Sequence, residues 1–338
     1  MRLENLLALT NGKVVNSPFV KQFTNIVFEA KKVKRGDLFI AFDDDTLEEA
    51  VLNGAYGVMF DKPTQISDQE IAWIKVDSLD DALKRLLRFR LIEKEIVVYE
   101  CNEIVLKLAL QVMSETNFIA LQGDIKTIYK TLWDLEDLNT ILFSPALTSK
   151  DLFTDIKQFP NNERKEKITV MEQTLFETSF VYDDVFYERQ LVSPFFVPFL
   201  EDLFNFFKVL QINFRLKKFT PIDHFEAVFT NKSFEIKEFG TSDKVLIFEK
   251  NTMLIEKQIV FLQKQAPWAQ IIYLIPEVLA KELGDQTGIF GYKSTNEILN
   301  ILKTNQFHFA LIVGASKEIL TKPLTNQAQI SLFDFNQG

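Results

Sequence analysis

The segment 33–60 constrains the fold more than any other part of the chain. Gly36-Asp37 is a turn signal, and the apolar run Leu38 to Phe42 is typical of a strand covered on both faces. Thr46 can cap a helix with acidic residues in its first turn, Asn53-Gly54 ends that helix, and an apolar strand follows. A strand–helix–strand unit of this kind predicts a parallel α/β sheet.

The same alternation continues along the chain and predicts an α/β fold with mostly parallel sheets. Further strands are predicted at 71–76, 118–121, 140–143, 168–172, 244–249, 269–275 and 307–313. Helices are predicted from Ser78, at 102–114, after the loop 122–127, at 195–211, up to Gln265, and at 294–303. The rhythm predicts three domains, 1–95, 96–225 and 226–322, followed by a loose tail at 323–338.

Composition excludes several classes of protein. The net charge of −9 argues against electrostatic coating of nucleic acid. A single cysteine, Cys101, rules out a disulfide framework and fits a reducing cytoplasm. Two distant histidines exclude most His-rich metal sites, and no apolar run approaches the roughly 20 residues that a membrane span needs. We therefore predict a cytoplasmic location without direct nucleic-acid or membrane binding.

The segment 33–60 also resembles a known family. A basic pair, Gly-Asp-Leu-Phe-Ile-Ala, and a helix ending Asn-Gly-Ala before an apolar strand are similar to the N-terminal domain of the Mur ligases. These enzymes add amino acids or dipeptides to UDP-N-acetylmuramic acid precursors of peptidoglycan, and the D-alanyl-D-alanine-adding type is most similar. The resemblance implies a UDP-binding N-terminal domain, a central phosphate-loop domain and a Rossmann-like C-terminal domain.

The resemblance places a nucleotide loop at Gln122 to Thr127. Gly123, Lys126 and Thr127 match the first glycine, the lysine and the first threonine of the family's Gly-x-x-Gly-Lys-Thr-Thr motif. The glycine before the lysine is missing, and Asp124 puts a carboxylate where phosphate would lie. A like charge beside phosphate in a partly desolvated site costs on the order of 1–4 kcal/mol. The resemblance implies ATP and Mg²⁺ as cofactors, whereas this loop favours a vestigial site.

Other family positions also depart from the pattern. Glu29-Ala30-Lys31 replaces the UDP-contacting Asp-Ser-Arg, and Asp43-Asp44-Asp45 replaces a Gly-rich segment. The three acids favour a solvated capping loop over a metal site. Glu172 resembles the strand-end glutamate that binds magnesium together with Thr127, although an ordinary exposed acid fits equally. His224 stands where the family has the glycine of a Gly-Arg pair, and we expect a surface or linker histidine.

The chain therefore reads as a degenerate Mur ligase, a pseudoenzyme with weak or no activity. Whether it is an enzyme stays open at this point. If it is active, the reaction is ATP-dependent ligation of an acid to an amino acid or peptide, with a UDP-muramoyl precursor as partner. Lys126 would then contact phosphate, and Thr127 and Glu172 would hold magnesium. No catalytic residue is assigned.

The tail carries a second signal, which favours a different class of function. Gln329-Ile330-Ser331-Leu332-Phe333 resembles the pentapeptide with which bacterial proteins dock on the β sliding clamp of DNA replication. Gln329 would supply amide hydrogen bonds, while Leu332 and Phe333 would fill an apolar pocket. The alternative hypothesis is a non-catalytic scaffold that binds the clamp through this tail. Packing of the tail on its own third domain is the competing interpretation.

Overall fold

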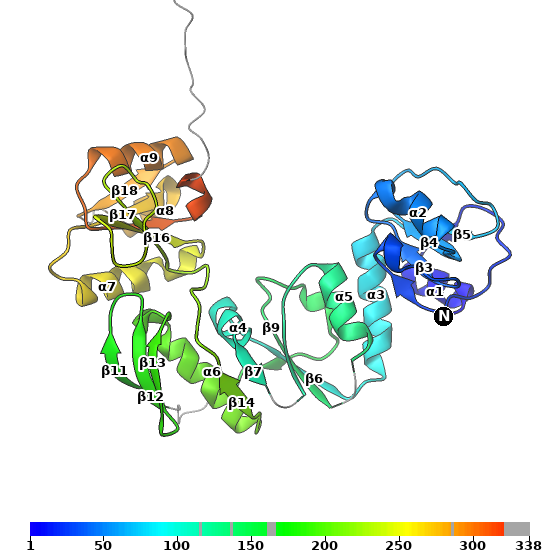
Figure 1. Ribbon diagram of the computed structural model, residues 1–338, viewed down its shortest axis with the longest axis horizontal. Helices are drawn as coiled ribbons and strands as arrows, with labels where there is room; N and C mark the ends of the chain where they lie inside the picture. The colour runs from blue at the N-terminus through cyan, green and yellow to red at the C-terminus, as the bar shows by residue number, and fades with distance from the viewer. Residues whose placement is uncertain (115–116, 136–137, 161–166, 285–286, 321–338) are drawn as a thin grey trace, which may run out of the picture. The chain divides into compact units, whose positions relative to one another are not determined.

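The computed structural model describes residues 1–114, 117–135, 138–160, 167–284 and 287–320 (Figure 1). The chain forms two compact units. Unit 1 comprises Met1–Arg164 and Leu203–Arg215, and unit 2 comprises Lys165–Asp202 and Leu216–Gly338. The three predicted domain ranges remain a prediction. The pentapeptide 329–333 lies outside the described residues.

Unit 1 begins with a five-stranded sheet of order β1-β5-β4-β3-β2, in which only β1 is antiparallel to its neighbour. Its elements are α1 (Leu3–Thr10), β1 (Lys13–Val14), β2 (Ile26–Val27), β3 (Leu38–Ile40), α2 (Leu47–Leu52), β4 (Gly57–Phe60), β5 (Ala72–Lys75) and α3 (Leu79–Ile92). The predicted strands and the Ser78 cap of α3 are confirmed, since the Ser78 hydroxyl accepts the N–H of Asp81. Thr46 precedes α2 as predicted, but its side chain makes no cap hydrogen bond because a 3-10 turn (Asp44–Thr46) leads into the helix.

A parallel sheet of order β10-β6-β9-β8 completes most of unit 1. Its elements are β6 (Ile96–Glu100), α4 (Glu103–Ala109), β7 (Val112–Ser114), β8 (Phe118–Leu121), α5 (Ile125–Trp133), β9 (Asn139–Phe143) and β10 (Lys157–Gln158). The prediction of one helix over 102–114 is wrong. The helix ends at Ala109, because Val112–Ser114 pairs instead with β14 (Phe214–Leu216), a partner about a hundred residues away in sequence.

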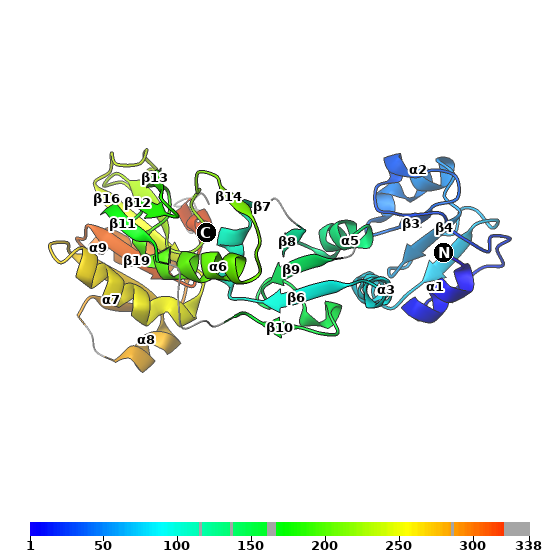
Figure 2. The same cartoon turned by 90° about the horizontal axis from the view of Figure 1, so that it is seen from below.

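One hydrophobic core joins the two sheets of unit 1. Leucines of α3 and the buried face of α5 belong to the same cluster, which also contains strand residues from both sheets. Figures 1 and 2 show α3 and α5 side by side, and residues of the two helices are in contact. This shared core fixes the position of α5, and therefore of the loop before it, against the N-terminal sheet.

Unit 2 contains a three-stranded antiparallel sheet followed by a doubly wound sheet of order β15-β16-β19-β17-β18. The first is built from β11 (Thr169–Gln173), β12 (Thr178–Tyr182) and β13 (Val185–Gln190). Helix α6 (Val197–Val209) follows, and its residues from Leu203 on belong to unit 1. The second contains β15 (Glu226–Thr230), β16 (Lys244–Glu249), α7 (Ile255–Gln265), β17 (Ile271–Pro276), α8 (Glu277–Leu283), β18 (Ile289–Tyr292), α9 (Thr295–Thr304) and β19 (Phe309–Val313). Helices α7 and α9 cover opposite faces of this sheet (Figure 1). The predicted parallel sheet is confirmed, with β15 as an antiparallel edge.

Candidate functional site

Helix α5 begins directly after the loop that the sequence marks as a phosphate loop. Strand β8 ends at Leu121 and α5 begins at Ile125, so the predicted order of strand, loop and helix is confirmed. The predicted loop 122–127 is too long, because the helix already includes Lys126 and Thr127. Gly123 has a φ of +135°, and a Cβ atom there would lie 3.0 Å from the Cβ of Thr127. Only glycine fits this position without strain, because the loop folds tightly onto the first turn of the helix.

Asp124 is the N-cap of α5. Its Oδ1 accepts a hydrogen bond from the Thr127 N–H at 2.8 Å. Hydrogen bonds from the Thr127 side chain and main chain hold the pKa of Asp124 below its usual value, with the positive charge of Lys126 as a smaller cause. The main-chain N–H groups at a helix start are the donors that a bound phosphate uses. In this chain the Thr127 N–H is already bonded to Asp124, and the carboxylate puts negative charge at the helix start, so the loop does not fit ATP phosphates unless the cap opens.

The residues assigned to nucleotide contact lie together in this loop and its helix. Gly123 and Thr127 are exposed, and Lys126 is half-buried in the first turn of α5. Glu172, assigned to magnesium, belongs to unit 2, where it is an exposed residue within β11 beside a shift in strand register. The roles of all four residues stay predictions. In the described part of the chain, no three His, Cys, Asp or Glu side chains gather to hold a metal ion.

A pocket of about 310 Å³ lies beside α5 in unit 1. Glu29, which the sequence resemblance matches with a UDP-contacting acid of the Mur ligases, is one of its lining residues. Its carboxylate bridges two lysines, with Oε1 2.6 Å from Lys130 Nζ and Oε2 2.7 Å from Lys32 Nζ. These hydrogen bonds, that of Lys130 first, lower the pKa of Glu29 to about 2. Two cations therefore face the pocket with one carboxylate between them.

The other side of this pocket is aromatic. The Tyr129 ring stacks on Trp133 at 4.8 Å and 16° and meets the edge of Phe28 at 5.2 Å. Tyr129 is only 2% exposed, and its hydroxyl has no hydrogen-bond partner among the residues that the structure describes. Burial raises the pKa of this hydroxyl. The full lining is Ile26, Val27, Phe28, Glu29, Lys32, Tyr129, Lys130, Trp133 and Asp134.

Sequence reasoning missed this pocket because its two walls are about a hundred residues apart. The one local signal was the pair Tyr129 and Trp133, whose spacing of four residues places both rings on one side of a helix. Lys130 lies between them and reaches Glu29 across 101 positions of sequence. An ion pair between residues so far apart in sequence cannot be predicted from the spacing of apolar residues along the chain.

His224 corrects one expectation. It lies in the link that enters β15, as predicted, but it is 1% exposed and is not a surface residue. Its Nδ1 is 2.7 Å from Oε1 of Glu249, a fully buried residue at the end of β16. The same carboxylate accepts the N–H groups of Phe225 and Asn251 and the side-chain amide of Gln258. A buried carboxylate is stable only when hydrogen-bond donors surround it, so His224 is buried beside Glu249 together with the other donors.

Two solved structures are similar to the chain along almost its whole length. One is UDP-N-acetylmuramoylalanyl-D-glutamyl-2,6-diaminopimelate–D-alanyl-D-alanyl ligase from Acinetobacter baumannii, with 12% identity, a TM-score of 0.50, and coverage of 95% of this chain and 97% of that chain. The other is a crystal structure of MurF from the same organism, with 11% identity, a TM-score of 0.52 and the same coverage. The fold is Mur ligase-like. No protein-family model matches the chain, and no curated protein does either.

At this level of identity the Mur ligase-like similarity shows the fold alone. Chemistry has to be argued from the residues, and the two sites of unit 1 differ in what they offer. The start of α5 already holds a carboxylate on the Thr127 N–H, whereas the pocket beside it combines two lysines with an aromatic wall.

No helix in the described ranges is long and apolar enough to cross a membrane.

Proposed function

We propose that this Mur ligase-like protein acts in peptidoglycan precursor metabolism in the cytoplasm and performs ATP-dependent ligation weakly or not at all. The observation that carries the proposal is the Asp124 carboxylate, which accepts the N–H of Thr127 at the start of α5. Ligation requires ATP phosphates at that position to activate a substrate carboxylate. A helix N-terminus that is capped by its own acid has one of its N–H donors occupied and offers phosphate an unfavourable negative charge.

The pocket beside α5 supports retention of a precursor-binding role. A UDP-linked muramoyl precursor carries a planar base and a diphosphate, and this pocket offers an aromatic wall together with Lys32 and Lys130. The diphosphate would take the place of Glu29 between the two lysines. This exchange involves side chains only, so it leaves the fold intact. We infer that the protein retains binding of the precursor and has lost most or all of the activity that ligates it to a peptide such as D-alanyl-D-alanine.

The test separates binding from turnover. Titration of the full chain with UDP should give saturable binding that Lys130→Ala weakens and that Lys94→Ala, a lysine of unit 1 outside this pocket, leaves unchanged. ADP release from Mg-ATP, UDP-muramoyl tripeptide and D-alanyl-D-alanine should stay at the background of a protein-free control. Precursor-dependent ADP release, removed by Lys126→Ala, would show that the ligase is active.

A second candidate function rests on the tail pentapeptide 329–333, which lies outside the described residues. We propose, as the alternative, a scaffold that docks on the bacterial β sliding clamp. Most of the affinity of such a peptide should rest on Leu332 and Phe333, because a few buried apolar side chains dominate peptide anchors.

The clamp proposal is tested with a peptide of residues 321–338. It should bind the clamp in the micromolar range, about −8 kcal/mol. The double variant Leu332→Ala/Phe333→Ala should lose that binding. An absence of binding, or equal binding by both peptides, rejects this function.

A further inference from the structure

Another pocket of unit 1 lies between the end of α3 and strand β6, and has a volume of about 190 Å³. Six apolar residues line it, and four of them, Leu91, Val98, Leu152 and Phe153, are at most 9% exposed. These four belong to the hydrophobic core of unit 1. The pocket shares no lining residue with the pocket at Glu29, so it is a separate apolar recess of that core.

Arg88 brings a positive charge to this recess. Its side chain is half-buried, and its Nε donates a hydrogen bond to the main-chain carbonyl of Asp151, in the 3-10 turn Lys150–Leu152. Among the residues that the structure describes, its two terminal Nη groups have no hydrogen-bond or ion-pair partner. A guanidinium held through Nε in this way keeps a planar pair of N–H donors that fits a carboxylate.

The other polar residues of the lining leave the recess with a positive net charge. Lys94 adds a second cation, Asp155 adds one acid, and Thr154 adds a hydroxyl group. Asp155 is exposed and forms no ion pair with either cation in the described part of the chain. The lining is therefore positive in a chain whose net charge is −9, and it suits an anion that also carries an apolar part.

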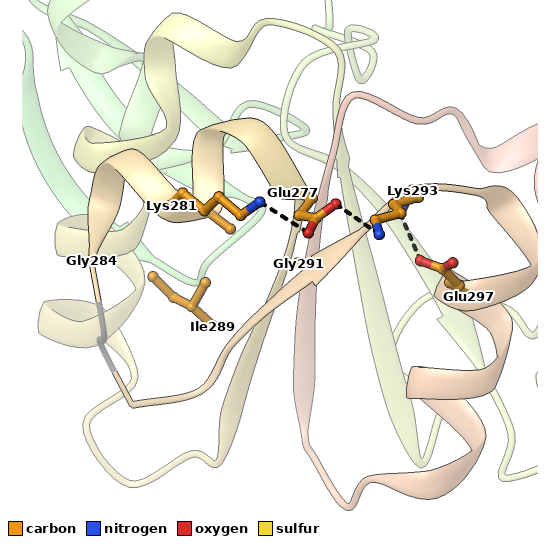
Figure 3. Close-up of a pocket in the computed structure, with 8 residues that line it drawn as sticks. Glu277, Lys281, Gly284, Ile289, Gly291, Lys293 and Glu297 are labelled. Carbon is orange, nitrogen blue, oxygen red and sulfur yellow. Dashed lines mark hydrogen bonds and ion pairs between the residues drawn. The ribbon is translucent and has the colours of Figure 1, made fainter.

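A hollow of about 710 Å³ in unit 2 has the opposite arrangement of charges (Figure 3). There Lys281 and Lys293 lie on either side of Glu277, with their Nζ atoms 3.1 Å from its Oε1 and 3.3 Å from its Oε2. Because an acid of the same chain already pairs with both lysines, this hollow offers an anion no vacant charge. The comparison favours the recess at Arg88 as an anion site.

The volume of the recess limits the size of its ligand. An apolar cavity of about 150 Å³ takes up benzene, a molecule of six carbon atoms. At the same density the 190 Å³ of this recess hold about seven or eight carbon atoms. Burial of each CH₂ group raises affinity about fourfold, for as long as the chain still lies inside the recess.

We propose that this recess binds an aliphatic carboxylate of about six to eight carbon atoms. The carboxylate accepts hydrogen bonds from the Nη groups of Arg88, and the hydrocarbon chain packs against Leu91, Val98 and Phe153. Thr154 can donate its hydroxyl to the second carboxylate oxygen. This site does not depend on the proposed ligase-like function, because it uses neither the start of α5 nor the pocket at Glu29.

Calorimetric titration of the full chain with octanoate tests the proposal. We expect saturable binding at one site with a Kd below about 1 mM, and Arg88→Gln should weaken it at least about tenfold because the charge is removed. Arg85→Gln is the matched control, since Arg85 is an exposed residue of α3 outside the recess. This variant should bind octanoate as the wild-type chain does.

A ligand series in the wild-type chain tests the same claim without any substitution. 1-Octanol has the hydrocarbon chain but no charge, so it should bind at least about tenfold more weakly than octanoate. Octanoate should bind more tightly than hexanoate, by about fourfold for each added CH₂ group. Dodecanoate should bind no more tightly than octanoate, because the additional carbon atoms stay in water.

Three results would overturn the proposal. One is the absence of saturable octanoate binding, and another is equal octanoate binding by the wild-type chain and Arg88→Gln. The third is an affinity that continues to rise from octanoate to dodecanoate, which would indicate adsorption on exposed apolar surface. Saturable binding that Arg88→Gln weakens, that Arg85→Gln keeps and that levels off at octanoate supports it.

Discussion

Two carboxylates of unit 1 lie at positions where the sequence resemblance predicts contact with phosphates, and they are held in different ways. Asp124 accepts a main-chain N–H and is part of the cap of α5. Within the described residues, Glu29 is held by the side chains of Lys32 and Lys130, beside a pocket. The Thr127 N–H is fixed in position by the helix, so a phosphate there has to displace the Asp124 side chain, whereas the two lysine side chains can move to exchange one anion for another. The comparison predicts that the first site is closed to nucleotides and the second is open.

Substitutions in the aromatic wall of the pocket beside Glu29 should have the largest effect on stability. Tyr129→Ala removes a ring that is 2% exposed and packs on Phe28 and Trp133, so it should lower the free energy of unfolding by about 3–5 kcal/mol. Tyr129→Phe should leave the free energy of unfolding unchanged, because the hydroxyl has no hydrogen-bond partner among the described residues. Urea denaturation of both variants checks this. A large loss in Tyr129→Phe would show that the hydroxyl is satisfied.

Any side chain at Gly123, in the loop before α5, should destabilise the fold. Gly123→Ala places a Cβ 3.0 Å from Thr127 at a φ of +135°, and we expect a loss of about 1–3 kcal/mol in the free energy of unfolding. Gly12→Ala is a useful comparison, since Gly12 is also crowded but has no positive φ. Equal losses at the two positions would mean that crowding, and not the backbone angle, dominates at Gly123.

The cap itself should have a smaller effect. Asp124→Ala should lower the free energy of unfolding by about 1 kcal/mol, and Asp124→Gly by only a few tenths, as is usual for N-cap positions. Asp134→Asn, which removes a charge near the other end of α5, serves as the control. A loss below a few tenths in Asp124→Ala would show that the acid does not cap the helix in solution.

The sequence predicted the framework better than these sites, for a physical reason. Strands such as β3, β16 and β19 could be predicted because each is a short apolar run. The Ser78 cap could be predicted because Ser78 directly precedes an amphipathic helix. The hairpin β12–β13 escaped notice, because its turn uses Asp183 and Asp184 at positive φ in place of the usual glycine.

The candidate sites divide in the same way. The loop around Gly123 was found because its motif is contiguous in sequence. The pocket at Glu29 and the buried pair of His224 with Glu249 were not, since each joins residues that only the tertiary fold brings together. Local sequence patterns predict local structure, but they do not predict which distant side chains pair in the tertiary fold.

The smallest expected effect concerns Glu29, whose pKa in the folded protein is about 2, below its ordinary value of 4.5. A lowered carboxyl pKa stabilises the fold above pH 4.5, and this stabilisation is lost as the pH falls from 4.5 toward 2. Glu29→Gln should therefore show a flatter dependence of the melting temperature on pH in that window. It should also bind UDP more tightly, because Lys32 and Lys130 lose their competing acid. An unchanged pH profile would contradict the ion-pair assignment.

Calorimetric titration of the full chain with Mg-ATP tests the central claim most directly. The account predicts no Mg-ATP binding at the start of α5, because Asp124 already occupies the Thr127 N–H there. The heat of titration and the melting temperature in millimolar Mg-ATP should therefore be the same in the wild-type chain and in Lys126→Ala. Bound ligand at about 100 times its Kd would stabilise the fold by roughly 2.7 kcal/mol, which a thermal scan detects easily. Saturable binding in the wild-type chain that Lys126→Ala abolishes would contradict it.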